Sequence, residues 1–161
     1  MHSTLWDATT PYTKRYIALK KQTMSKTYNI FISHSWEYSD AYEKLCGMLE
    51  GKSYFNYNNH SVPKDDPIHT NGTDKQLKIA ITNKMSNCHI VLIMAGKYST
   101  YSKWIKKEID IAKNDFTNAK PIIGIKPWAS TQVSSVVKDN ADKMVGWNTE
   151  TIVQAIKDYS I

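Results

Sequence analysis

The chain has 161 residues, of which 41% are apolar, and this suits one domain with its own hydrophobic core. Its net charge is +6, and Arg15 is its one arginine. Because the recognition of bases and phosphates relies heavily on arginine, we expect no nucleic-acid partner. The apolar runs are far shorter than the roughly 20 residues that a membrane span needs, and the first residues lack the apolar segment of a signal peptide. We therefore expect a cytoplasmic protein that does not enter a membrane.

Residues 1–23 show little periodicity. They hold four basic residues against Asp7, which gives this segment a net charge of +3. We expect a leader that is either flexible or a short basic helix over 13–22, and we assign it no function. The domain is expected to span residues 24–161, because the strand pattern YNIFIS opens at Tyr28.

From Tyr28 onward, strand and helix patterns alternate along the chain. Strands are predicted at residues 28–33, 54–57, 89–95, 121–125 and 144–147. Helices are predicted before Gly51, after a cap at Thr73 or Asp74, around Glu108, over 131–140 and after a cap at Thr149. The runs HIVLIMA and PIIGI lack polar alternation, as expected of strands that are buried on both faces. The pattern predicts a flavodoxin-like α/β fold, a five-stranded parallel sheet with helices on both faces.

Three polar segments follow the first three strands of this predicted sheet. They are SHSWEYS after residue 32, the long loop at 58–72, and GKYSTYSKW after the third strand. In such sheets ligands bind beyond the carboxyl ends of the strands, and long loops without their own structure are often functional. The three segments are therefore expected to border one crevice, with Glu108 one turn into the helix that follows the third.

The stretch YSKWIKKEIDIAK at 101–113 is predicted to form that helix. One apolar stripe runs along it, formed by Ile105, Ile109, Ala112 and Phe116. Trp104 and Glu108 are i, i+4 neighbours beside the stripe. We expect the Glu108 carboxylate at the edge of the core, where it lines a cleft or pairs with a nearby lysine.

Several sites that use this architecture are disfavoured by the residues present. A phosphorylated receiver needs acidic residues after the first and third strands, and a dinucleotide loop needs glycines at the first turn. Neither pattern is found, and there is no P-loop or serine-hydrolase triad. No metal site is expected, because His60, His69 and His89 lack ligand spacing. Cys46 and Cys88 are expected to be reduced, with a disulfide between them as the alternative.

The opening YNIFISHS, the long loop after the second strand and the Trp-x-x-x-Glu of SKWIKKEI together resemble TIR domains, over roughly residues 28–161. Within that superfamily the chain is similar to the bacterial TIR-like proteins of Thoeris antiphage defence, the ThsB type. The loop sequence SVPKDDPIHTNG departs from the animal-adaptor pattern.

This resemblance implies an enzyme that cleaves NAD between nicotinamide and ribose, with Glu108 as the catalytic glutamate and Trp104 as the tryptophan that precedes it. A carboxylate against the sugar can stabilise the positive charge that develops on the ribose. NAD is then the substrate, and neither a cofactor nor a metal is expected.

Other residues around the predicted crevice are candidates for substrate contacts. They are Ser33, His34, Ser35, Trp36, Lys64, Asp65, Tyr98, Ser99 and Trp104. Hydroxyl and imidazole groups can donate to pyrophosphate or adenosine, aromatic rings can stack and exclude water, and the two loop charges can close over the ligand. Each also has a structural alternative, as a packing residue, a turn or cap residue, or a solvated charge.

The resemblance to Thoeris proteins, in which the TIR protein makes a nucleotide messenger, implies a cyclic ADP-ribose isomer as the product. The residues agree with this, because the chain shows one candidate carboxylate and no clear second acid to activate water. An oriented internal nucleophile then has the advantage over bulk water. A separate effector protein is the expected reader of this messenger, and self-association of TIR domains is a second expected contact. Two alternatives stay open: a non-enzymatic TIR scaffold, and an enzyme like the nucleoside 2-deoxyribosyltransferases with Glu108 as nucleophile.

Overall fold

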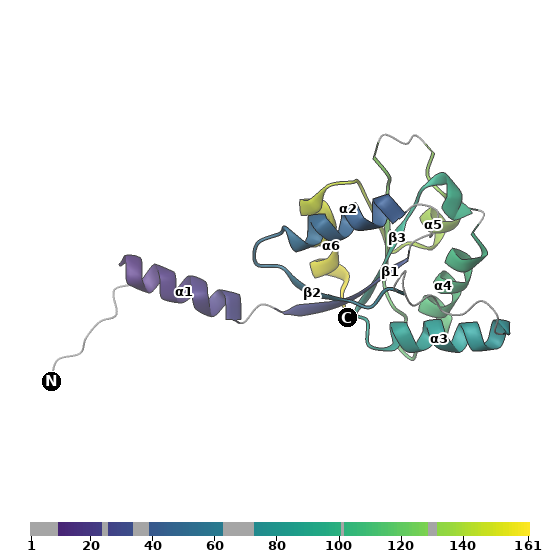
Figure 1. Ribbon diagram of the computed structural model, residues 1–161, viewed down its shortest axis with the longest axis horizontal. Helices are drawn as coiled ribbons and strands as arrows, with labels where there is room; N and C mark the ends of the chain where they lie inside the picture. The colour runs from purple at the N-terminus through teal and green to yellow at the C-terminus, as the bar shows by residue number, and fades with distance from the viewer. Residues whose placement is uncertain (1–9, 24–25, 34–38, 63–72, 101, 129–131) are drawn as a thin grey trace.

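The sheet at the centre of this computed structural model contains five parallel strands in the spatial order β2-β1-β3-β4-β5 (Figure 1). The strands are β1 (Thr27–Ser33), β2 (Asn56–Asn59), β3 (Ile90–Met94), β4 (Ile122–Ile125) and β5 (Lys143–Val145). The residues that the structure describes are 10–23, 26–33, 39–62, 73–100, 102–128 and 132–161. This strand order is that of flavodoxin-like folds, so the predicted fold class is confirmed.

One helix precedes the first strand, and the other helices follow the strands along the chain. They are α1 (Pro11–Thr23), α2 (Ser39–Glu50), α3 (Asp74–Ser86), η2 (Lys97–Thr100, a 3₁₀ turn), α4 (Lys103–Asn114), α5 (Ser135–Asn140) and α6 (Thr149–Tyr159). Side-chain caps determine where several of these helices begin. Thr73 and Gln76 form a reciprocal capping box at the start of α3, and the hydroxyl of Ser102 accepts from the Ile105 N–H at the start of α4.

Strand alternation sends neighbouring side chains into two separate cores. Ile30 and Ile32 pack on one face of the sheet with the buried residues of α2 and α6. Phe31 packs on the other face with α3, α4 and α5. Because successive side chains of a strand point to opposite faces, Ser33 shares the face of Phe31. The last residue of β1 is thereby directed into the layer that contains α4.

A glycine in β4 makes room for close packing on this second face. A Cβ atom built on Gly124 would lie 2.2 Å from the Met144 sulfur and 3.1 Å from Cγ1 of Val137. Gly124 therefore lets the β5 and α5 side chains approach the sheet. The carboxyl ends of the strands meet at one edge, and the end of the chain lies at the other, where the Ile161 N–H donates to the carbonyl of His89.

Two local predictions from the sequence were wrong. The aromatic run at 54–57 was expected to be a strand, but Tyr54 has a φ of 61°, so the chain turns there and β2 begins at Asn56. The cap of α6 is Asn148, whose side chain accepts from the Thr151 N–H, and Thr149 is the first helical residue.

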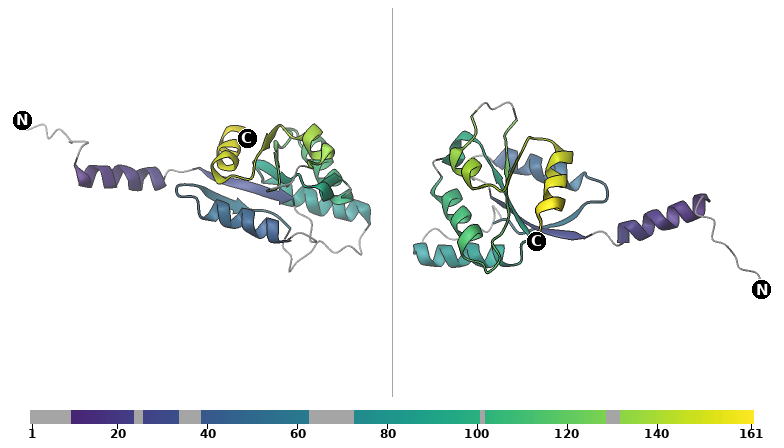
Figure 2. Two further views of the ribbon diagram at one scale, coloured as in Figure 1. Left: turned by 90° about the horizontal axis from the view of Figure 1, so that it is seen from above. Right: turned by 180° about the vertical axis from the view of Figure 1, so that it is seen from behind.

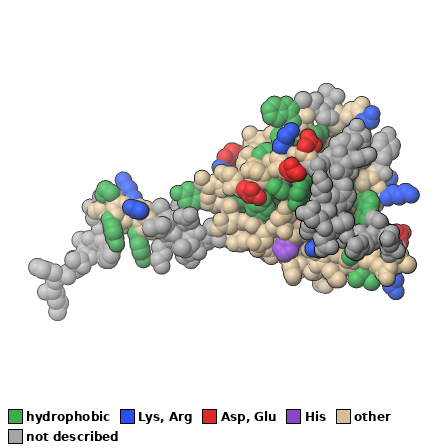
Figure 3. Space-filling view, in the orientation of Figure 1, with side chains coloured by type: hydrophobic (Ala, Val, Ile, Leu, Met, Phe, Trp, Pro, Cys, Tyr) green, Lys and Arg blue, Asp and Glu red, His purple; other side chains and the backbone are tan. Residues whose placement is uncertain are grey.

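The α1 helix stands apart from the sheet and its covering helices in each of the views (Figures 1 and 2). Hydrophobic and basic side chains on it stand clear of the domain (Figure 3). Tyr12, Tyr16 and Ile17 are 75%, 50% and 46% exposed. Among the residues that the structure describes, no helix is long and apolar enough to cross a membrane.

Removal of residues 1–23 should change the melting temperature by less than about 5 °C, because none of the α1 side chains that the structure describes, at residues 11–17, belongs to the buried core. Calorimetry of the full chain and of a variant that starts at Met24 measures this. A larger drop would show that the segment packs on the domain in solution.

Candidate active site

The site is built from the end of β1 and the middle of α4. Ser33 is 0% exposed, and its register partner on the neighbouring strand is Ile93, another residue of the α4 face. Ser33 is the last residue of β1, at the carboxyl edge of the sheet. This places a hydroxyl group inside an otherwise apolar layer, at the edge where flavodoxin-like folds bind ligands.

Glu108 reaches the same point from α4. Ile105, Ile109 and Ala112 form the predicted apolar stripe and are buried. Glu108 is itself only 7% exposed. It is therefore more deeply buried than a residue at the edge of the core, where we expected it. The reason is the position of the helix, which lies against the sheet along its length and also buries Ile111.

A hydrogen bond joins the two residues: the Ser33 hydroxyl donates to Oε2 of Glu108. Burial raises the pKa of Glu108 from 4.5 to about 7, and the Ser33 hydrogen bond opposes that rise by favouring the carboxylate. A carboxyl group with a pKa near 7 changes its charge around neutral pH. Strongly perturbed carboxyl groups in clefts are typical of catalytic sites.

Of the other predicted site residues, three lie in the part of the chain that the structure describes and five do not. Ser99 is buried in η2, and its hydroxyl donates to the carbonyl of Met94 at the end of β3. Trp104 lies one turn before Glu108 and is 41% exposed, which leaves part of its ring free for a ligand. Tyr98 belongs to η2, next to Ser99. The remaining candidates, His34, Ser35, Trp36, Lys64 and Asp65, lie outside the described residues.

One exposed aromatic residue at this edge was missed by the sequence analysis. Trp128 lies three residues beyond the end of β4 and is 81% exposed, the largest fraction among the exposed large hydrophobic side chains of the described ranges. Its position just after a buried strand was a sequence signal that could have pointed to it. The segment around it shows no helical or strand periodicity, so the sequence pattern assigned it to no element.

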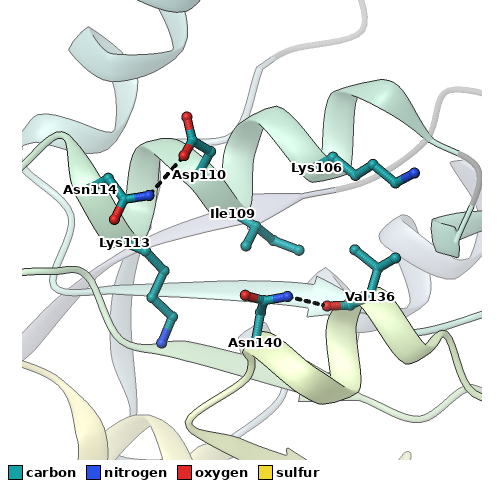
Figure 4. Close-up of a pocket in the computed structure, with 7 residues that line it drawn as sticks. All are labelled: Lys106, Ile109, Asp110, Lys113, Asn114, Val136 and Asn140. Carbon is teal, nitrogen blue, oxygen red and sulfur yellow. Dashed lines mark hydrogen bonds between the residues drawn. The ribbon is translucent and has the colours of Figure 1, made fainter.

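A separate hollow lies between α4 and α5 (Figure 4). Its lining residues are Lys106, Ile109, Asp110, Lys113, Asn114, Val136 and Asn140. Its volume of about 270 Å³ is slightly below the usual range of ligand pockets. Helical spacing puts these α4 residues on nearly the opposite side of the helix from Glu108. Several of its polar groups already have partners, since Asn114 donates to Asp110 and Lys113 pairs with Asp142.

No group of three His, Cys, Asp or Glu side chains that could hold a metal ion occurs in the part of the chain that the structure describes.

The parallel sheet in flavodoxin-like order and a buried glutamate on the helix after β3 define a TIR-like α/β domain. Residues 31–132 match the family model described as Thoeris protein ThsB, TIR-like domain, and the chain belongs to this family. No curated protein shows a significant match to the sequence.

Among solved structures, the chain is similar to the CMP N-glycosidase BcmB of Clostridium botulinum. The similarity covers 81% of this chain and 98% of BcmB, with 12% sequence identity and a TM-score of 0.43. It is too distant to indicate a shared activity.

The raised pKa of Glu108 predicts that Glu108→Gln stabilises the folded protein at neutral and higher pH. Near pH 4 both folded and unfolded states hold the proton, so the variant and the wild type should be equally stable. As the pH rises from 4.5 to about 7, the unfolded state releases its proton first and wild-type stability falls. Above about pH 7 the gain should level off at on the order of 3 kcal/mol, because one pKa unit is 1.36 kcal/mol.

Denaturant unfolding of the two proteins at pH 4, 6 and 8 measures this difference, and contributions from all other carboxyl groups cancel in it. An equal stability of variant and wild type at pH 8 would contradict the burial cost assigned to Glu108.

Proposed function

We propose that this protein is a TIR-type enzyme that cleaves NAD to nicotinamide and a cyclic ADP-ribose isomer. The observation that carries the proposal is Glu108, a buried carboxyl group at the carboxyl edge of the sheet, hydrogen-bonded to Ser33 and one turn after an exposed tryptophan. Membership of the ThsB TIR-like family supports the same reaction class.

The reaction needs one anion at the ribose. The bond from C1′ of the ribose to the nicotinamide nitrogen breaks, and its electron pair neutralises the pyridinium ring. Nicotinamide therefore leaves without being protonated, and positive charge develops on the ribose. The ionised carboxylate of Glu108 can stabilise this charge at short range, in surroundings where burial reduces screening by water.

The substrate itself assists the ionisation of this carboxyl group. A cationic nicotinamide riboside close to Glu108 favours the charged form and opposes the effect of burial on its pKa. The active protonation state is thus the carboxylate. In the free enzyme it is populated at and above about pH 7.

Aromatic residues at the edge complete the proposed site. Trp104 and Trp128 offer exposed rings that can stack on nicotinamide or adenine and limit the access of water. In the last step a hydroxyl oxygen or adenine nitrogen of the same molecule bonds to C1′ and loses a proton. Orientation of that internal nucleophile favours ring closure over hydrolysis. A separate effector protein would read the product, and self-association of the domain could regulate its synthesis.

Incubation with NAD, followed by chromatography with mass detection, tests the reaction. Wild-type protein should release nicotinamide and a product with the mass of ADP-ribose less one water. Glu108→Gln should be slower by about 10² or more, because the anion is lost while the shape and the hydrogen-bond acceptor for Ser33 remain. The matched control is Asp110→Asn, an exposed acid on the same helix, which should keep wild-type turnover.

The assay distinguishes the alternatives by product. Linear ADP-ribose without a cyclic species would identify the protein as a hydrolase and would refute the proposed messenger. Exchange of bases on a deoxynucleoside would identify a deoxyribosyltransferase-like enzyme, and the absence of any turnover in extracts of phage-infected cells would favour a scaffold. A Glu108→Gln variant within about threefold of wild type would remove Glu108 from its catalytic role.

A further inference from the structure

The two oxygens of the Glu108 carboxyl group have different surroundings. Oε2 accepts the Ser33 hydroxyl, whereas Oε1 has no hydrogen-bond partner among the described residues. Oε1 is therefore the oxygen of this carboxyl group that stays available to a ligand.

We propose that Ser33 is a positioning residue whose hydroxyl fixes Oε2 of Glu108, so that Oε1 is the oxygen that faces the ribose of the substrate. This inference rests on the proposed NAD cleavage and changes the role expected for Ser33, which the sequence suggested as a direct donor to pyrophosphate or adenosine. A residue that is 0% exposed and whose hydroxyl proton is already donated is poorly suited to contact a phosphate.

A hydroxyl group suits this place because it can serve both forms of the carboxyl. It donates a hydrogen bond to the carboxylate, and it can accept a hydrogen bond from the neutral acid without movement of the backbone. Since the pKa of Glu108 is about 7, both forms occur near neutral pH. A lysine or arginine at position 33 would instead hold Glu108 permanently charged and would compete with the cationic substrate.

Several charged groups on α4 and on the elements around it pair with one another. On the α3 side, Asp74 pairs with Lys107 at 3.0 Å, and Lys78 pairs with Asp115 at 3.0 Å and Asp110 at 3.9 Å. Towards β5, Lys113 pairs with Asp142. The other charged groups on these elements are Lys75, Lys84, Lys97, Lys103, Lys106, Lys138, Asp139 and Lys143. None of these groups perturbs the pKa of Glu108, which responds to burial and to Ser33.

The test compares Ser33→Ala with wild type in steady-state NAD cleavage between pH 5 and 9. The acid limb of kcat/KM should move upward by about one pH unit, because the hydrogen bond that favours the carboxylate is lost. At pH 7 kcat should fall about tenfold and should partly recover at pH 9, while KM should stay within about threefold. Ser33→Thr keeps a hydroxyl group and should restore the wild-type midpoint.

The control is Ser134→Ala. Ser134 is 1% exposed and caps α5 through the Val137 N–H, so its loss also costs stability, but without a bond to Glu108. It should leave the pH midpoint unchanged. A raised KM for Ser33→Ala with an unmoved pH midpoint would overturn the proposal and return Ser33 to substrate binding.

A second measurement does not require turnover. The free energy of unfolding is measured against pH for two pairs of proteins. One pair is wild type and Glu108→Gln, and the other is Ser33→Ala and the double variant Ser33→Ala/Glu108→Gln. The difference within each pair isolates the titration of Glu108. The pH at which this difference levels off should lie about one unit higher with alanine. Levelling at the same pH would refute the coupling of Ser33 to Glu108. If the two levelling points differ but wild-type protein leaves NAD intact, the coupling stands and the proposed reaction is what fails.

Discussion

The burial of one carboxyl group beside one hydroxyl group is the constraint on which the proposed site depends. Glu108 lies in an apolar layer, and the Ser33 hydroxyl is the hydrogen-bond donor that the described structure gives it. A buried carboxylate with a single donor is costly at neutral pH, and a substrate that develops positive charge relieves that cost. The same arrangement therefore lowers the stability of the free protein and favours a cationic transition state.

Two features of the fold produce this arrangement: the alternation of side chains along β1, and the position of the helix that follows β3. β1 lies between β2 and β3, so the helix that follows β3 can cover the end of β1. Ser33 shares the face of Phe31, and that face is covered by α3, α4 and α5. Two residues 75 positions apart in sequence thus become hydrogen-bonded. Regular elements hold both of them, which gives the pair more precise geometry than a loop would.

Much of this could be predicted from the sequence. The continuous apolar runs at 89–95 and 121–125 predicted the buried parallel strands, and helical spacing predicted α4 and its stripe. The pairing of Ser33 with Glu108 could not be predicted, since it depends on the register and on how α4 crosses the sheet. The turn at Tyr54 was missed for a related reason: β-propensity favoured a strand, but the connection after α2 requires a positive φ there.

The most direct test of this account is a carbon-13 NMR titration of the Glu108 carboxyl group in the wild-type protein without ligand, assigned by comparison with Glu108→Gln. The account predicts a midpoint near pH 7, as expected for a buried carboxyl group held by one hydroxyl. A midpoint near 4.5, the ordinary value for glutamate, would mean that Glu108 is solvated in solution and would contradict the central claim.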